Sequence, residues 1–146
     1  MRLTENFDLE EFTKSETATE RGIKNNPSAS HLANLKKLAN ALEKVRELVG
    51  KPITISSGYR SQELNKAVGG VSTSKHTQGL AADIVVSGMT PKELATRISE
   101  SDIDYDQCIL EFGRWVHFGL SGSSPRRENL TATKKNGKTV YLKGIV

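Results

Sequence analysis

The chain has 146 residues, which suits one domain with a hydrophobic core that needs no disulfide. Hydrophobic residues make up 36% and charged residues 26%, which excludes a disordered chain, and the single cysteine, Cys108, excludes an intrachain disulfide. The net charge of +4 suits an anionic partner such as a cell-wall polymer or nucleic acid, and equally an ordinary surface with a lysine excess.

Nothing in the sequence predicts insertion into a membrane. No apolar run approaches the roughly 20 residues that span a bilayer. The first six residues, Met1–Asn6, contain no apolar stretch of the kind found in signal peptides. We therefore expect cytoplasmic synthesis without a signal peptide, followed by release through another route.

The N-terminal segment predicts a short helix followed by loops. Asp8 and Glu11 have the spacing of a capping box, and Phe7 and Phe12 occupy the two positions of a hydrophobic staple. The Ser- and Thr-rich residues that follow and the polar stretch 22–30 predict loops.

The main helix is predicted over residues 30–49. Apolar residues recur there at spacings of three and four, which is typical of one face of an α-helix. Gly50 and Pro52 end the pattern. The apolar positions are Leu32, Leu35, Leu38, Ala39, Leu42, Val45 and Leu48.

The central part of the chain alternates between strands and polar connections. Residues 53–56 alternate between apolar and polar side chains and include β-branched ones, so they predict a strand. A turn, a short helix, a polar loop and a second, apolar strand are expected to follow at residues 57–60, 61–68, 71–79 and 81–86.

The last third predicts one helix and further strands. Thr90, Pro91 and Glu93 form a helix start, with a threonine cap and proline in the first turn. Strands are expected at residues 106–111, 115–120 and 139–142, the last of them after a hairpin turn at 134–138. The pattern predicts one α+β domain over residues 1–146, with a mostly antiparallel sheet of four to five strands and two to three helices.

The stretch from Ser74 to Asp83 carries the strongest sign of a functional site. Asp83 lies inside an apolar strand, where a lone carboxylate is costly unless it is paired. A metal ion is one such partner, with His76 as a second ligand and His117 as a third. A plain hydrogen bond between His76 and Asp83 is the structural alternative.

Two histidines and one carboxylate leave a fourth position open on zinc, which is typical of a catalytic site rather than a structural one. The reaction would also need a general base, and Glu111 is the candidate. If residues 112–114 form the hairpin loop, Glu111 pairs with Trp115 and lies on the same face as His117. A two-residue loop would put Glu111 on the other face.

Four further residues are candidates for substrate contacts. Arg60 follows the first strand and could donate to a developing oxyanion or hold a substrate carboxylate. Ser74 and Gln78 flank His76 and could orient it or contact substrate, and Trp115 is expected to form a wall of the cleft.

These motifs resemble peptidase family M15, the zinc D-Ala-D-Ala carboxypeptidases and phage endolysins. Residues 74–83 match the S-x-H-x-x-G-x-A-x-D signature of that family, and residues 57–61 look like its arginine turn. The resemblance to the phage-type branch rests on three further segments, 6–15, 64–70 and 115–117, and the whole covers roughly residues 5 to 130.

The resemblance implies a fold like that of hedgehog and D-Ala-D-Ala peptidases, with zinc bound by His76, Asp83 and His117. It also implies that Arg60 contacts the substrate or the transition state. Many members have an acidic residue three positions before the last histidine, where this chain has Arg114. Glu111, six positions before, is similar to what the phage-type branch leads us to expect.

We therefore expect a monomeric zinc peptidase that hydrolyses peptidoglycan stem peptides after release in phage or prophage lysis. The cleaved bond is left open between D-Ala-D-Ala carboxypeptidase and L-Ala-D-Glu-type endopeptidase action, since Arg60 or Arg114 could hold a terminal carboxylate. The alternative is a non-catalytic peptidoglycan-binding module on the same fold. A nucleic-acid partner is not expected, because the chain has no recognisable motif for one.

Overall fold

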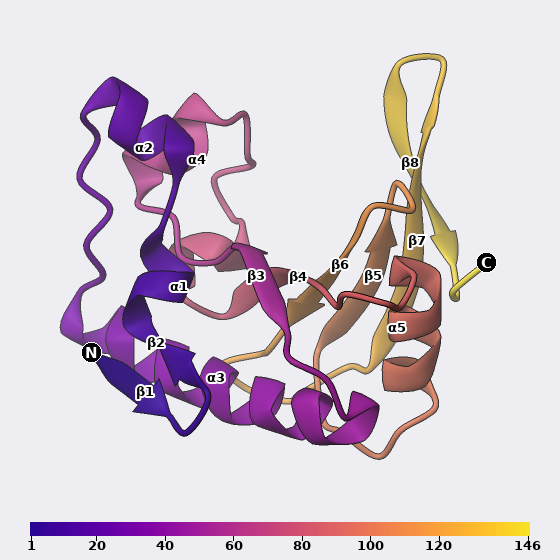
Figure 1. Ribbon diagram of the computed structural model, residues 1–146. Coiled ribbons are helices and arrows are strands. Elements are labelled where there is room, and N and C mark those ends of the chain that lie inside the picture. The colour runs from indigo at the N-terminus through magenta and orange to yellow at the C-terminus, as the bar shows by residue number, and fades with distance from the viewer.

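A six-stranded sheet forms the body of the computed structural model, which describes residues 1–146 (Figure 1). Its strand order is β3-β4-β6-β5-β7-β8, and every neighbouring pair is antiparallel except β5 and β7, which are parallel. The strands are β3 (Thr54–Ser57), β4 (Ala81–Val85), β5 (Gln107–Glu111), β6 (Trp115–Gly119), β7 (Glu128–Lys135) and β8 (Lys138–Lys143).

Two helices cover one face of this sheet. The long helix α3 (Ala29–Val49) contacts α5 (Pro91–Ser99), and α5 packs against β5 and β6. Their apolar faces meet alternate strand residues in a core cluster of 21 buried residues. Those strand residues are Ala82, Ile84, Cys108, Leu110, Val116 and Phe118.

The remaining strand residues point to the opposite face, because side chains alternate along a strand. Asp83, Ile109, Glu111, Trp115 and His117 are on this second face. The alternation therefore separates an apolar face, buried under α3 and α5, from a face that carries titratable side chains.

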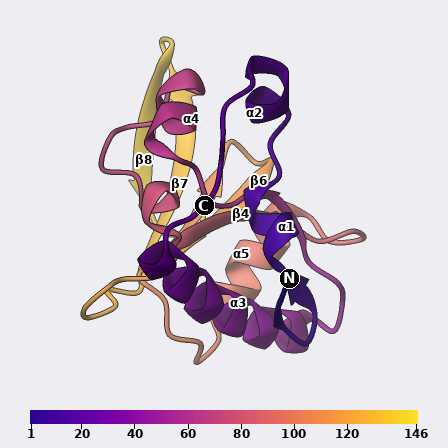
Figure 2. The ribbon, with the colours of Figure 1, turned by 90° about the vertical axis from the view of Figure 1, so that its left-hand side faces the viewer.

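The second face is bordered by shorter elements. These are α4 (Gln62–Ala67) and the 3-10 helix η1 (Lys75–Gln78), with α2 (Glu16–Arg21) in contact with α4. Figures 1 and 2 show α2, α4 and the tip of the β7–β8 hairpin at the end of the molecule opposite α3. No helix has both the length and the apolar character that crossing a membrane requires.

The N-terminal segment forms a small sheet of β1 (Arg2–Thr4) and β2 (Phe7–Asp8), followed by α1 (Leu9–Thr13). The predicted cap of α1 is present, since the Glu11 carboxylate accepts from the Asp8 backbone N–H at 2.7 Å. The predicted staple is present too, with the Phe7 and Phe12 rings 6.2 Å apart.

The predicted α+β class is confirmed, but the predicted counts of strands and helices are wrong. There are five α-helices rather than two to three, and the main sheet has six strands and one parallel pair. The Ser-rich loop expected before residue 22 contains α2, because Ser15 caps it and Gly22 ends it in a left-handed conformation. The polar strand β7 was not expected, since only its Leu130 and Ala132 are apolar.

Candidate metal centre

His76 is held in the first turn of η1 by its neighbour Ser74. The Ser74 hydroxyl accepts from the His76 backbone N–H at 3.2 Å, which is an N-cap, and the Thr77 hydroxyl donates to the Ser74 carbonyl at 2.6 Å. Gly79 then ends the turn with φ +74°, which directs the chain into β4. The residue His76 is thereby buried, with 4% of its surface exposed.

The pairing of β4 with β6 brings the other two candidate ligands together. Asp83 is the register partner of His117, so the two side chains leave the same face of the sheet side by side. Asp83 is 6% exposed, and His117 is also largely covered. Two segments 34 residues apart in sequence therefore meet at the His76 loop.

The three side chains converge on one point. His76 Nε2 is 3.4 Å and His117 Nδ1 is 3.2 Å from Asp83 Oδ1, and one ligand atom from each residue lies within 4.8 Å of the others. A tetrahedral zinc with ligands at about 2.1 Å would space those atoms about 3.4 Å apart. The two separations from Asp83 Oδ1 therefore match a zinc ion, for which the three side chains would be ligands and one position would stay open.

A hydrogen bond behind His76 selects its tautomer. His76 Nδ1 lies 2.7 Å from the carbonyl oxygen of Gly58, so Nδ1 donates to that oxygen, and Nε2, which faces Asp83, is the ring nitrogen left for a metal ion. The position of Gly58 is fixed in turn, because the Tyr59 backbone N–H donates to the Phe12 carbonyl at 2.6 Å. The Gly58 carbonyl, held in place by this backbone hydrogen bond, therefore orients His76 for metal binding.

The charges in the cluster favour an ionised carboxylate. Burial alone would raise the pKa of Asp83, but the hydrogen bonds and charges of His117 and His76 outweigh it and hold that pKa well below its usual range. Burial also opposes protonation of His117, but Asp83 outweighs it and raises the pKa of His117. Asp83 is therefore ionised in this cluster and is the negatively charged group that a bound cation would meet.

Arg60 lies beside this centre on the turn after β3. Its Nη2 is 4.0 Å from Asp83 Oδ2, and its Nη1 donates to Asn65 Oδ1 at 3.3 Å. The Arg60 backbone N–H also donates to the His76 carbonyl at 3.1 Å. The guanidinium is thus held at the edge of the cluster with donors free toward the cleft.

Two buried asparagines position the turn that carries Arg60. Asn65, on α4, accepts from Arg60 and donates to the Val71 carbonyl at 2.8 Å. Asn25 donates to the Tyr59 carbonyl at 2.9 Å and accepts from the Ser61 backbone N–H at 2.7 Å. Because Asn25 bonds the backbone on both sides of Arg60 and Asn65 bonds the Arg60 guanidinium itself, the turn and its side chain have little freedom to move.

The hairpin between β5 and β6 has the predicted three-residue loop. Glu111 pairs with Trp115, so the predicted register is confirmed and the two side chains share a face with His117. The indole Nε1–H of Trp115 donates to Glu111 Oε1 at 2.7 Å. This bond fixes one carboxylate oxygen and leaves the other available to a substrate or water.

These side chains line one cleft of about 470 Å³, which contains all three candidate ligands. Arg60, Ser74, Glu111 and Trp115 line it as well. Gln78 does not, contrary to its expected role, and its carbonyl instead accepts from Asn34 on α3 at 2.8 Å.

Arg114 does not line the cleft either. It is exposed in the hairpin loop and lines a separate groove beside Phe112 and Lys134. Of the two arginines considered for a terminal carboxylate, Arg60 alone is in the cleft.

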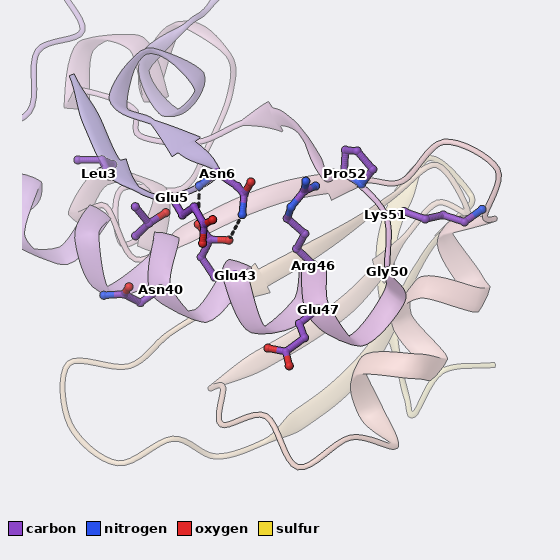
Figure 3. Close-up of a pocket in the computed structure, with 11 residues that line it drawn as sticks. Leu3, Glu5, Asn6, Asn40, Glu43, Arg46, Glu47, Gly50, Lys51 and Pro52 are labelled. Atoms are coloured by element: carbon purple, nitrogen blue, oxygen red, sulfur yellow. Dashed lines mark hydrogen bonds between the residues drawn. The ribbon is translucent and has the colours of Figure 1, made fainter.

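A second hollow, of about 640 Å³, lies away from the cleft between the β1–β2 turn and α3 (Figure 3). Its most enclosed acid, Glu43, accepts from the backbone N–H and the side-chain amide of Asn6, both at 2.7 Å. Glu43 is therefore used to attach the N-terminal segment to α3. No histidine lines this hollow, and the one cluster of side chains that could hold a metal ion lies in the cleft.

Comparison with known proteins agrees with this geometry. The Peptidase M15 family matches residues 5–119, which is most of the chain and includes every member of the three-residue cluster. The chain belongs to the Peptidase M15 family. A stretch of 44 residues, 30% of the chain, is 48% identical to the zinc D-Ala-D-Ala carboxypeptidase of Streptomyces albus G. That stretch spans 17% of the length of the carboxypeptidase.

Several residues of this Peptidase M15 site were not predicted from the sequence to take part in it. Gly58 and Asn65 lie inside segments that resemble the family, so a motif-level signal existed for both. Asn25 lies in a polar stretch that predicts only a loop. Tyr141 and Arg126 line the cleft but come from beyond residue 119, where no motif pointed to them.

Proposed function

We propose that this chain is a zinc-dependent peptidase that hydrolyses peptide bonds in the stem peptides of bacterial peptidoglycan. The observation that carries the proposal is the convergence of His76, Asp83 and His117 in one cleft with Glu111. Membership of the Peptidase M15 family supports it. The short match to a zinc D-Ala-D-Ala carboxypeptidase supports zinc as the metal and a wall peptide as the substrate.

In this proposal His76 Nε2, Asp83 Oδ1 and His117 Nδ1 hold the zinc. When bound, zinc supplies a Lewis acid that polarises the scissile carbonyl and makes a neighbouring water more acidic. The Gly58 carbonyl keeps His76 in the tautomer that can ligate. Asp83 offsets one of the two positive charges of the ion.

Glu111 acts as the general base and then as the general acid. Its free oxygen takes a proton from the attacking water as the water oxygen bonds to the carbonyl carbon. The carboxylic acid then gives that proton to the leaving amine as the C–N bond breaks, which restores the carboxylate. Trp115 orients Glu111 through the 2.7 Å hydrogen bond and leaves the reacting oxygen unencumbered.

Arg60 stabilises the negative charge that develops on the carbonyl oxygen. Its guanidinium is already positioned by Asn65 and by the turn at residues 59–61, so little reorganisation is needed during the reaction. The nearby carboxylate of Asp83 keeps the guanidinium beside the ligand cluster.

The cleft also suits an acidic substrate. Two further cations, Lys75 and Arg126, line it together with Arg60. Stem peptides carry free carboxylates, which such side chains would attract. We place the reaction in phage or prophage lysis on the resemblance of residues 6–15 and 115–117 to the phage-type branch. Lysis of cells only when the chain is produced with a membrane-permeabilising partner would support this setting.

The direct test is digestion of purified peptidoglycan by the zinc-loaded protein, with mass spectrometry of the released fragments. Release of D-alanine alone would identify a carboxypeptidase, and release of longer peptides an endopeptidase. The Glu111→Gln variant serves as the matched control, because it should keep zinc and lose turnover. Intact peptidoglycan after digestion with fully zinc-loaded protein would overturn the proposal in favour of a binding module.

A further inference from the structure

The β7–β8 hairpin adds a wall to the cleft from a part of the chain that the family match does not cover. The match ends at residue 119, whereas the hairpin spans residues 128–143. It joins the sheet through the parallel pairing of β7 with β5, the strand of Glu111. One of its side chains, Tyr141 on β8, lines the same cleft as the three candidate ligands.

The strand register places Tyr141 in one row with Glu111. Trp115 pairs with Glu111, Glu111 with Ala132, and Ala132 with Tyr141. Residues that pair across neighbouring strands point to the same face, and strands lie about 4.8 Å apart. Glu111 is therefore flanked by Trp115 on one side and by Tyr141, two strands away, on the other, with the small, buried Ala132 between them.

The fold does not use the Tyr141 side chain for its own stability. The residue is 55% exposed, lies outside the hydrophobic core, and its hydroxyl bonds to no other group of the chain. Burial of part of the ring, together with the charge of Glu111, raises the pKa of Tyr141. The phenol therefore stays protonated at neutral pH and can donate a hydrogen bond.

We propose that Tyr141 binds the leaving-group side of the peptide substrate, with its ring against the peptide and its hydroxyl donating to a carbonyl. The direction follows from the strand order. The candidate ligands are on β4 and β6, Glu111 is on β5 and Tyr141 is on β8. A scissile carbonyl at the ligands puts the leaving amine beside Glu111, and the rest of the leaving segment continues over β7 toward Tyr141.

This inference rests on the proposed peptidase function, because the leaving side is defined by the roles of the ligands and Glu111. The ring and the hydroxyl together should strengthen substrate binding by as much as one aromatic contact and one hydrogen bond typically do. Since Tyr141 contacts substrate before and during the reaction alike, its removal should raise KM more than it lowers kcat.

The test compares Tyr141→Ala and Tyr141→Phe with Leu142→Ala as the matched control. Leu142 is the next residue on β8, is also exposed and points to the opposite face. We expect kcat/KM for released stem-peptide fragments to fall about tenfold in Tyr141→Ala, mainly through KM, and about threefold in Tyr141→Phe. Leu142→Ala should stay within about twofold of the unmodified protein, and all three variants should keep its melting temperature.

A second readout keeps this inference separate from the proposed activity. In a Glu111→Gln background, binding to purified peptidoglycan is measured by co-sedimentation with and without Tyr141→Ala. Weaker sedimentation of the double variant supports substrate binding by Tyr141 even if the unmodified chain hydrolyses nothing, an outcome that would refute only the proposed function. Unchanged kcat/KM and unchanged sedimentation in Tyr141→Ala would refute the role of Tyr141 while leaving the peptidase function intact.

Discussion

The two sides of the cleft are built in different ways. On the ligand side, His76 and Asp83 are almost fully buried, and the Gly58 carbonyl, Ser74 and Asn65 each hold a neighbouring group by a hydrogen bond. On the hairpin side, nearly every residue of β8 is exposed, and its attachment depends on backbone pairing with β7.

This difference separates two requirements of a hydrolytic site. Ligand atoms must stay within a few tenths of an ångström of their positions, which calls for buried and mutually hydrogen-bonded supports. A substrate wall has no such requirement, because an exposed side chain can adjust to the peptide that it meets. The ligand side should therefore tolerate few substitutions, while the hairpin side should tolerate many and mainly affect substrate preference.

The largest effect is expected at Glu111, where the two sides meet. Glu111→Gln keeps the size of the side chain and its acceptor for Trp115 but removes the proton acceptor, so kcat should fall by about 10² to 10⁴. Zinc content should not change, because Glu111 is not among the candidate ligands. Turnover equal to that of a Glu128→Gln control would show that Glu111 is not the base.

Arg60→Lys should lower kcat by about 10² while zinc content stays the same. Lysine keeps the positive charge but cannot reach both Asn65 and the oxyanion with a rigid fork of donors. Steady-state kinetics on a synthetic stem peptide measure the effect. A kcat close to that of the unmodified protein would mean that the charge alone is sufficient.

Gly58→Ala tests how rigid the ligand side is. A Cβ on Gly58 would lie 2.5 Å from the Phe12 carbonyl oxygen, so α1 or the Gly58 turn must move. We expect a loss of about 2 kcal/mol in the free energy of unfolding, and weaker zinc binding because the Gly58 carbonyl orients His76. Gly122→Ala is the control, since no atom lies within 4 Å of that Cβ. Equal stability of the two variants in urea would argue against a rigid support.

The smallest effect is expected from breaking the ion pair between Arg126, just before β7, and Asp106, which should change the stability of the fold. Arg126 donates from Nε and Nη2 to the buried Asp106, at 3.0 and 2.9 Å, and these bonds lower the pKa of Asp106 against the effect of burial. A lowered pKa means that the pair stabilises the fold above the unfolded pKa of about 3.9, and that this stabilisation is lost as the pH falls through the folded pKa.

Arg126→Met should therefore lower the free energy of unfolding near neutral pH, and lower it progressively less in acid. Urea unfolding of both proteins across a pH series measures the difference. A difference that stays constant from neutral pH into strong acid would show that Asp106 is not the group responsible.

The sequence was most informative where side chains are periodic or belong to a compact motif. The apolar spacing between residues 30 and 49 predicts α3 to within one residue at its start, and the apolar run around Asp83 predicts β4. The hairpin loop at residues 112–114 predicts the register that puts Glu111 and His117 on one face. These features are local, so neighbouring residues suffice to specify them.

The missed features depend on contacts between distant segments. Strand β7 is polar and is held by parallel pairing to β5, which no local pattern reveals. Asn25 acts through the Tyr59 carbonyl, 34 residues away in sequence, which only the folded chain brings near it. Gln78 lies two residues from His76 in sequence, yet it does not line the cleft, and its carbonyl bonds Asn34 on α3 instead.

The most direct test of this account is the metal content of the purified protein, measured by elemental analysis beside the His76→Ala variant. We predict about one zinc per chain in the unmodified protein, and loss of that zinc in the variant, because two remaining ligands cannot hold the ion in competition with water. A chain that holds no zinc even after reconstitution would contradict the account, as would a His76→Ala variant that retains it.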